Sequence, residues 1–148
     1  MKMLKLEAKD LQNIKINKKE ILNFLGSEKL EIGFFESAKY PSGEYVAQVA
    51  RYNEFGTLNI PMRPFFRNAI QKNISKWYST LGSAIKKDIS AKKALSIVGE
   101  VARADIIESI TSLNAPPNAQ STIKQKGSAN PLIDTGLMRR SVTYKVKG

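Results

Sequence analysis

Glu100, Asp105 and Glu108 are clustered acidic residues whose spacing could support chemistry, because Glu100 and Glu108 fall near one face of a predicted helix. Three carboxylates can supply the oxygen ligands that magnesium prefers, and a metal-dependent nuclease would use such a site. The solvent-exposed face of an amphipathic helix needs acidic residues just as much. We therefore predict a solvated helix face here and no metal site.

Histidine and cysteine are both missing from the 148 residues. Without histidine the chain lacks the commonest general base and transition-metal ligand, and without cysteine it lacks thiol nucleophiles and disulfides. The sequence also has no GxxxxGK or GxGxxG loop that would cradle a phosphate. Asp134, before Thr135 and Gly136, is more typical of a turn cap than of a catalytic acid. We predict a protein that is not an enzyme and has no cofactor.

The net charge of +11 is unevenly distributed along the chain. Residues 61–93 and 121–148 are strongly basic, whereas 31–60 and 94–120 are mildly acidic. Such a pattern suits a protein close to a nucleic-acid backbone, and equally one whose basic face meets an acidic neighbour or simply faces solvent. The basic residues that we place nearest to DNA are Lys72, Lys76, Lys86, Lys87, Lys124 and Lys126.

A short helix is predicted near residues 18–25. Asn17 and Glu20 resemble a capping box, and Gly26 follows as a stop. The rest of 1–28 carries no clear pattern, so we treat this region as an N-terminal extension around that helix. A chain of 148 residues suits one domain with one core. No apolar run approaches the ~20 residues of a membrane span, so we expect a soluble protein with no membrane partner.

Two long amphipathic helices are predicted after residue 63. Pro64 suits the first position of a helix, and the apolar residues from Phe66 to Ile85 then form one stripe. A second stripe runs from Leu95 to Leu113 and ends at a proline-containing breaker. We expect both stripes in the core, and we expect Arg63 and Phe65 to fix the start of the first helix against the sheet, with Phe65 or Phe66 buried.

Strands are predicted at 30–35 and at 45–52, joined as a hairpin by a turn at 41–43, and again at 141–146. Residues 114–136 form a long polar loop, which in a compact domain is usually functional or disordered. The predicted fold class is α+β. It comprises a small antiparallel sheet of three or four strands, two long helices packed on one face, and the long loop before the C-terminal strand.

Two motifs resemble a known family. Residues 54–57 read Glu-Phe-Gly-Thr and are followed by Arg-Pro-Phe at 63–65, while residues 131–136 read Pro-Leu-Ile-Asp-Thr-Gly. In this order they resemble the conserved stretches of tail-completion and head–tail joining proteins of tailed phages and prophages. The resemblance covers roughly residues 29–146, and the two long helices match only in character.

The resemblance implies one tail-completion-like domain that assembles with copies of itself into a ring, often a hexamer, at the neck or tail terminus. Its partners would be the phage connector or head-completion proteins and the major tail protein, with transient non-specific contact to genomic DNA. The protein would be a structural virion component assembled in the host bacterial cytoplasm, without catalytic residues. The residues that we place at subunit or virion interfaces are Glu54, Phe55, Gly56, Thr57, Arg63, Asp134, Thr135 and Gly136.

An alternative function is non-specific nucleic-acid binding. In that case free DNA would be bound without a ring, and the affinity would fall steeply with salt because each phosphate contact releases counterions.

Overall fold

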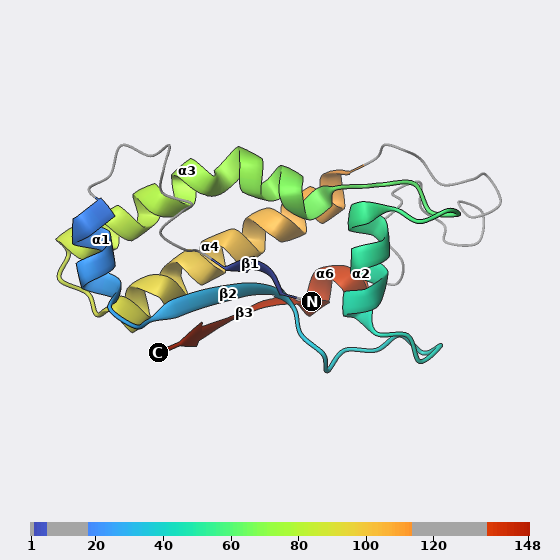
Figure 1. The fold of residues 1–148 in the computed structure, drawn as a ribbon, viewed down its shortest axis with the longest axis horizontal. Helices are drawn as coiled ribbons and strands as arrows, with labels where there is room; N and C mark the ends of the chain where they lie inside the picture. Colours follow the sequence, from blue (N-terminus) through green and yellow to red (C-terminus); the bar gives the residue numbers. More distant parts are fainter. Residues whose placement is uncertain (1, 6–17, 114–135) are drawn as a thin grey trace.

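The computed structural model describes residues 2–5, 18–113 and 136–148, and nearly all of the predicted long loop lies outside these ranges. The α+β class is confirmed (Figure 1). The described elements are β1 (Lys2–Lys5), α1 (Lys18–Leu25), β2 (Lys29–Phe34), α2 (Val46–Phe55), α3 (Phe65–Lys86), α4 (Ala91–Ser112), α6 (Leu137–Ser141) and β3 (Val142–Lys147).

The sheet has the strand order β1-β2-β3, and both pairs are antiparallel. β3 pairs with the whole of β2, from Lys29 opposite Lys147 to Phe34 opposite Val142. α4 packs on β2 and β3, and α3 packs lengthwise along α4 (Figure 1). The described helices include none with both the length and the apolar character needed to cross a membrane.

The stripes of the two long helices supply most of the core. In α4 the side chains at the predicted positions are buried from Leu95 to Ile110. In α3 the helix continues through Gly82 to Lys86, and its largest buried side chain is Trp77. The indole Nε1 of Trp77 donates to the Asp105 carboxylate at 2.7 Å, so this buried N–H has a partner.

The start of α3 packs against the sheet through Phe65, as the sequence analysis expected. Phe65 and Phe66 are both buried, and the ring of Phe65 meets that of Phe34 edge to face at a centroid distance of 6.1 Å. Pro64 is the N-cap residue rather than the first helical residue. The first two residues of α3, Phe65 and Phe66, thus anchor the start of the helix in the core.

The predicted hairpin is wrong in its second strand, because residues 46–55 form α2. The buried residues of α2 recur at the helical spacing, and the β-forming residue types of this segment concealed that period. The predicted turn at 41–43 does form, with the Gly43 N–H donating to the Tyr40 carbonyl at 2.9 Å, but it precedes a helix. The buried positions of α2 are Val46, Ala47, Ala50, Asn53 and Glu54.

Other elements match the expected ranges closely. α1 spans the predicted residues, and Gly26, with φ +56°, donates its N–H to the Leu22 carbonyl at 3.1 Å. The C-terminal strand is shifted by one residue, because the short helix α6 occupies 137–141. α6 was not predicted, since five residues are too few to show a helical period.

Truncation of either buried phenylalanine should destabilise the fold. We expect Phe65→Ala and Phe66→Ala each to lower the free energy of unfolding by about 3–5 kcal/mol, because each leaves a cavity in the core. Phe55→Ala is the matched control, since that ring is 57% exposed. Urea denaturation measures all three variants. Unchanged midpoints for both core variants would contradict this packing.

Candidate docking site

Glu54 lies near the end of α2 and its side chain is buried. The carboxylate accepts hydrogen bonds from the backbone N–H groups of Phe66 at 2.9 Å and Arg67 at 3.1 Å. The first N–H groups of a helix have no partner within the helix, and the positive end of its dipole favours an anion. Because Pro64 offers no side-chain cap, Glu54 caps α3 from the preceding helix.

Arg67 connects this carboxylate to the loop between α2 and α3. Its Nε donates to Glu54 Oε1 at 2.8 Å, and its Nη2 donates to the Glu54 backbone carbonyl, also at 2.8 Å. The same nitrogen lies 3.3 Å from the sulfur of Met62, and the guanidinium carbon lies 5.2 Å from the ring centroid of Phe55. One half-exposed side chain thus ties together both ends of the loop.

Arg63 and Asn53 form a second connection across the base of the loop. The backbone N–H of Arg63 donates to the Asn53 carbonyl at 2.6 Å, and Arg63 Nη1 donates to Asn53 Oδ1 at 3.2 Å. The amide of Asn53 donates in turn to the Val49 carbonyl at 3.0 Å. Burial lowers the pKa of Arg63, but a guanidinium keeps its charge in proteins. The pair holds the end of the loop against α2.

Residues 56–62 form the loop itself, which we call the docking loop. Its turn is closed twice, because the Thr57 N–H donates to the Ile60 carbonyl at 2.8 Å and the Ile60 N–H donates to Thr57 Oγ1 at 3.0 Å. Gly56 has φ +75°, and a Cβ there would lie 3.0 Å from the backbone nitrogen of Met62. The tight start of the loop therefore requires glycine.

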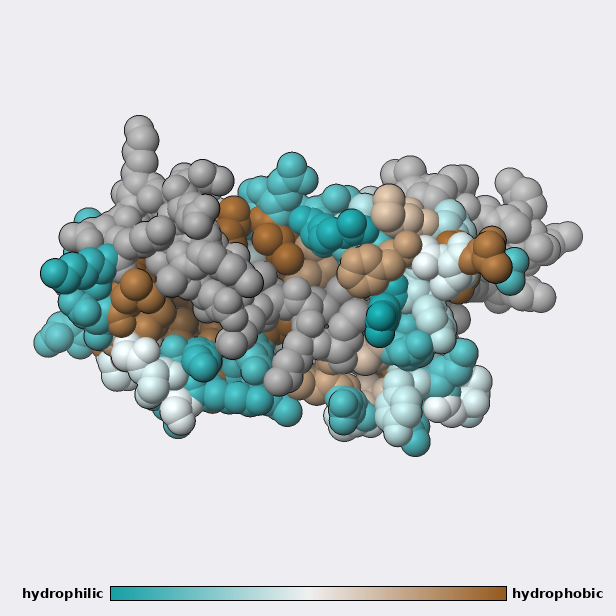
Figure 2. Space-filling view, in the orientation of Figure 1, coloured by the Kyte–Doolittle hydropathy of each residue, from teal (hydrophilic) through white to brown (hydrophobic). Residues whose placement is uncertain are grey.

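Leu58 stands at the tip of this hydrogen-bonded turn and is fully exposed, at 104% of the reference area. Phe55 and Met62 beside it are 57% and 52% exposed. Figure 2 shows hydrophobic residues at the surface at the end of the molecule where this loop lies. Exposed apolar side chains on a hydrogen-bonded loop are typical of a protein-binding surface, because little further ordering is needed on binding.

Two predicted interface residues have a different role from the expected one. Glu54 and Arg63 are buried inside the described fold, so they hold the docking loop and do not form its outer surface. Phe55 and Thr57 are exposed and remain candidates for contact. The interface assignment itself stays a prediction.

Leu58, Met62 and Arg67 were not singled out in the sequence analysis. The signal that could have found Leu58 is an apolar residue placed between two motifs, in a segment with no helical or strand period.

The second motif is described only at its last residue. Gly136 is buried with φ +76°, and its carbonyl accepts from the Arg140 N–H at 3.2 Å at the start of α6. α6 contacts α2, so this residue reaches the same end of the molecule as the docking loop (Figure 1). Asp134, Thr135, Lys124 and Lys126 lie outside the described residues.

The clustered acidic residues do not converge on a common point. Asp105 pairs with Lys76 at 2.7 Å, and Glu100 accepts from the hydroxyl of Tyr144 at 3.0 Å. Within the described ranges no group of three acidic side chains could hold a metal ion. Of the lysines that we predicted to lie near DNA, Lys76 forms an ion pair with Asp105. Lys86 and Lys87 are exposed at the end of α3.

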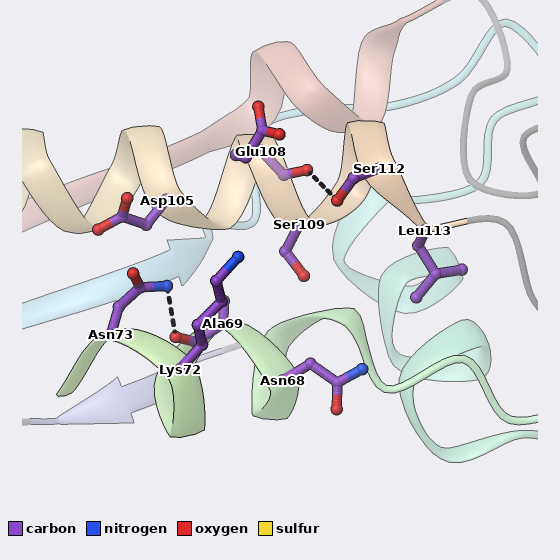
Figure 3. Close-up of a pocket in the computed structure, with 9 residues that line it drawn as sticks. All are labelled: Asn68, Ala69, Lys72, Asn73, Asp105, Glu108, Ser109, Ser112 and Leu113. Atoms are coloured by element: carbon purple, nitrogen blue, oxygen red, sulfur yellow. Dashed lines mark hydrogen bonds between the residues drawn. The ribbon is translucent and has the colours of Figure 1, made fainter.

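A pocket of about 310 Å³ lies between α3 and α4 (Figure 3). Lys72 reaches it from α3, and Asp105 and Glu108 line it from α4. Several of its polar groups bond to backbone of their own helices, as Asn73 does to the Ala69 carbonyl at 2.9 Å. Its mixed charges single out no class of ligand.

Comparisons of the chain with protein-family models, with curated proteins and with solved structures find no match.

Replacing Glu54 should destabilise the fold, because its buried carboxylate caps the start of α3. Glu54→Gln should cost about 1–3 kcal/mol because buried hydrogen bonds are lost, and Glu54→Lys about 3–5 kcal/mol because a buried cation then faces the start of α3. Chemical denaturation measures both, with the exposed Glu108→Gln as control. A Glu54→Lys variant as stable as the parent would contradict the capping role.

Proposed function

We propose that this chain is a structural subunit of a tailed-phage or prophage virion. It would form a ring at the head–tail interface or tail terminus and complete tail assembly. The observation that carries the proposal is the docking loop, which exposes Leu58 on a hydrogen-bonded turn whose base is held by the buried contact of Glu54 with the start of α3. Residues of the first of the two motifs that resemble the phage proteins, at 54–57 and 63–65, hold or form this loop.

The chemistry of the docking loop favours adhesion over catalysis. Its exposed groups are aliphatic, aromatic and thioether side chains, which gain free energy when a partner covers them. In this proposal the small three-stranded sheet with α3 and α4 is a rigid scaffold for the loop. The partners would be further copies of the chain, the connector or head-completion protein and the major tail protein. The protein would be assembled in the host bacterial cytoplasm and retained in the virion.

Non-specific nucleic-acid binding remains the alternative, and one surface favours it. The turn between α3 and α4 and the helix ends beside it carry four exposed lysines and a single acidic residue, Asp88. Two of the lysines lie in the first turn of α4, where the helix dipole disfavours a cation. An anionic neighbour would offset this unfavourable interaction and the repulsion among the lysines. In a ring, this turn would meet passing DNA. The lysines are Lys86, Lys87, Lys92 and Lys93.

Removal of the exposed leucine should abolish self-association without loss of stability. We expect the parent protein to sediment as larger species with rising concentration and Leu58→Ser to stay monomeric, because the apolar tip of the contact is gone. Thermal unfolding should be unchanged, since Leu58 is fully exposed.

Leu22→Ser is the matched control, because Leu22 is 44% exposed on α1 and should not affect assembly. Self-association of Leu58→Ser equal to that of the parent would contradict the role of the loop. Loss of DNA binding in Lys86→Glu, with no self-association in any variant, would favour the nucleic-acid alternative.

A further inference from the structure

We propose that a groove beside α2 receives the docking loop of a second copy of this chain. The inference rests on the proposed function and names the two surfaces that would meet in the ring. The groove has a volume of about 650 Å³. It lies between the segment before α2 and the exposed side of that helix, and its lining includes Glu36, Glu44, Tyr45, Gln48, Arg51 and Tyr52.

The walls of the groove are connected to the fold by backbone hydrogen bonds. The Tyr40 N–H donates to the Glu44 carbonyl at 2.8 Å, and the Val46 N–H donates to the Ala38 carbonyl at 3.0 Å. Tyr45 is 46% exposed, and the Lys39 ammonium lies 4.6 Å from its ring centroid. The groove is thus already formed in a single copy, as the docking loop is.

The shapes and surface chemistry of the two parts fit one another. The docking loop is convex, with one apolar side chain at its tip, and the groove is concave, with two tyrosines in its lining. A tyrosine ring offers an apolar face to a leucine, and its hydroxyl can bond the polar backbone of a turn. A pocket of this volume can accept the tip of the turn together with Leu58.

Electrostatics disfavour most contacts between two copies of a chain with net charge +11. Two such copies repel each other least where their contact brings opposite charges together. The groove lining carries two carboxylates, of Glu36 and Glu44, and one guanidinium, of Arg51, and the Lys39 ammonium lies over the ring of Tyr45. The groove is therefore close to neutral, and the half-exposed guanidinium of Arg67 at the base of the docking loop meets less repulsion there than on the basic surfaces of the chain.

The groove and the docking loop are different patches of the chain, so a contact between two copies would be heterologous: the loop of one copy would bind the groove of the next. The groove lining runs along α2 from Tyr45 to Tyr52, whereas the docking loop begins at Gly56, after the C-terminal end of this helix. The two surfaces share no residue. Two different patches of one chain that bind each other generate a ring when the rotation between copies closes. This is the assembly that the proposed function requires.

Disulfide trapping tests the contact directly, because the chain has no cysteine of its own. Asn59→Cys and Gln48→Cys each place one thiol at an exposed position, one next to Leu58 on the docking loop and one in the groove, and Leu58 itself is kept. Under mild oxidation, an equal mixture of the two variants should give a cross-linked dimer several-fold more abundant than either variant gives alone. Lys92→Cys replaces Gln48→Cys in the control mixture, since it lies on a different helix. Non-reducing gels and mass spectrometry identify the linked pair.

The outcomes separate this inference from the proposed function. An Asn59→Cys homodimer stronger than the mixed dimer would indicate a two-fold contact and overturn the inference. Self-association of the parent without a mixed cross-link would also overturn it, while leaving a ring built through other surfaces. A parent protein that stays monomeric at every concentration and gives no cross-link would remove the ring proposal as well.

Discussion

The bond between the Glu54 carboxylate and the start of α3 is the interaction on which this structure depends. It joins α2 to α3 across residues 56–64 and satisfies two backbone N–H groups that Pro64 cannot cap. By fixing the first turn of α3, it directs Phe65 and Phe66 into the core. Because Arg67 is bound to the same carboxylate, the docking loop is closed at its base and Leu58 is held away from the protein.

The elements with a strong apolar period could be predicted from the sequence. The long helices and α1 fall close to their expected positions because their buried residues repeat every three or four positions. α2 could not be predicted in this way, because Val46, Val49 and Tyr52 favour strands and only contacts with the rest of the fold reveal the helical face. Likewise, nothing local indicates that Glu54 is buried, since its main partners lie twelve and thirteen positions further along the chain.

The motif that resembles the phage proteins acquires a physical meaning in this fold. Glu54 and Arg63 are the buried supports, Gly56 permits the tight backbone, and Thr57 closes the turn. In the proposed ring, the intervening and fully exposed Leu58 would contact the partner. The opposite end of α3 carries exposed lysines, so one end of the protomer is suited to protein contact and the other to an anion (Figure 1).

The central claim is that the docking loop is rigid before any partner arrives. Backbone ¹⁵N relaxation of the monomer at low concentration measures this directly for Leu58 and its neighbours. The account predicts order parameters near those of α2 and α3, about 0.85, with a clear drop in Glu54→Gln. Values below about 0.6 for the loop in the parent protein, beside ordered helices, would contradict it.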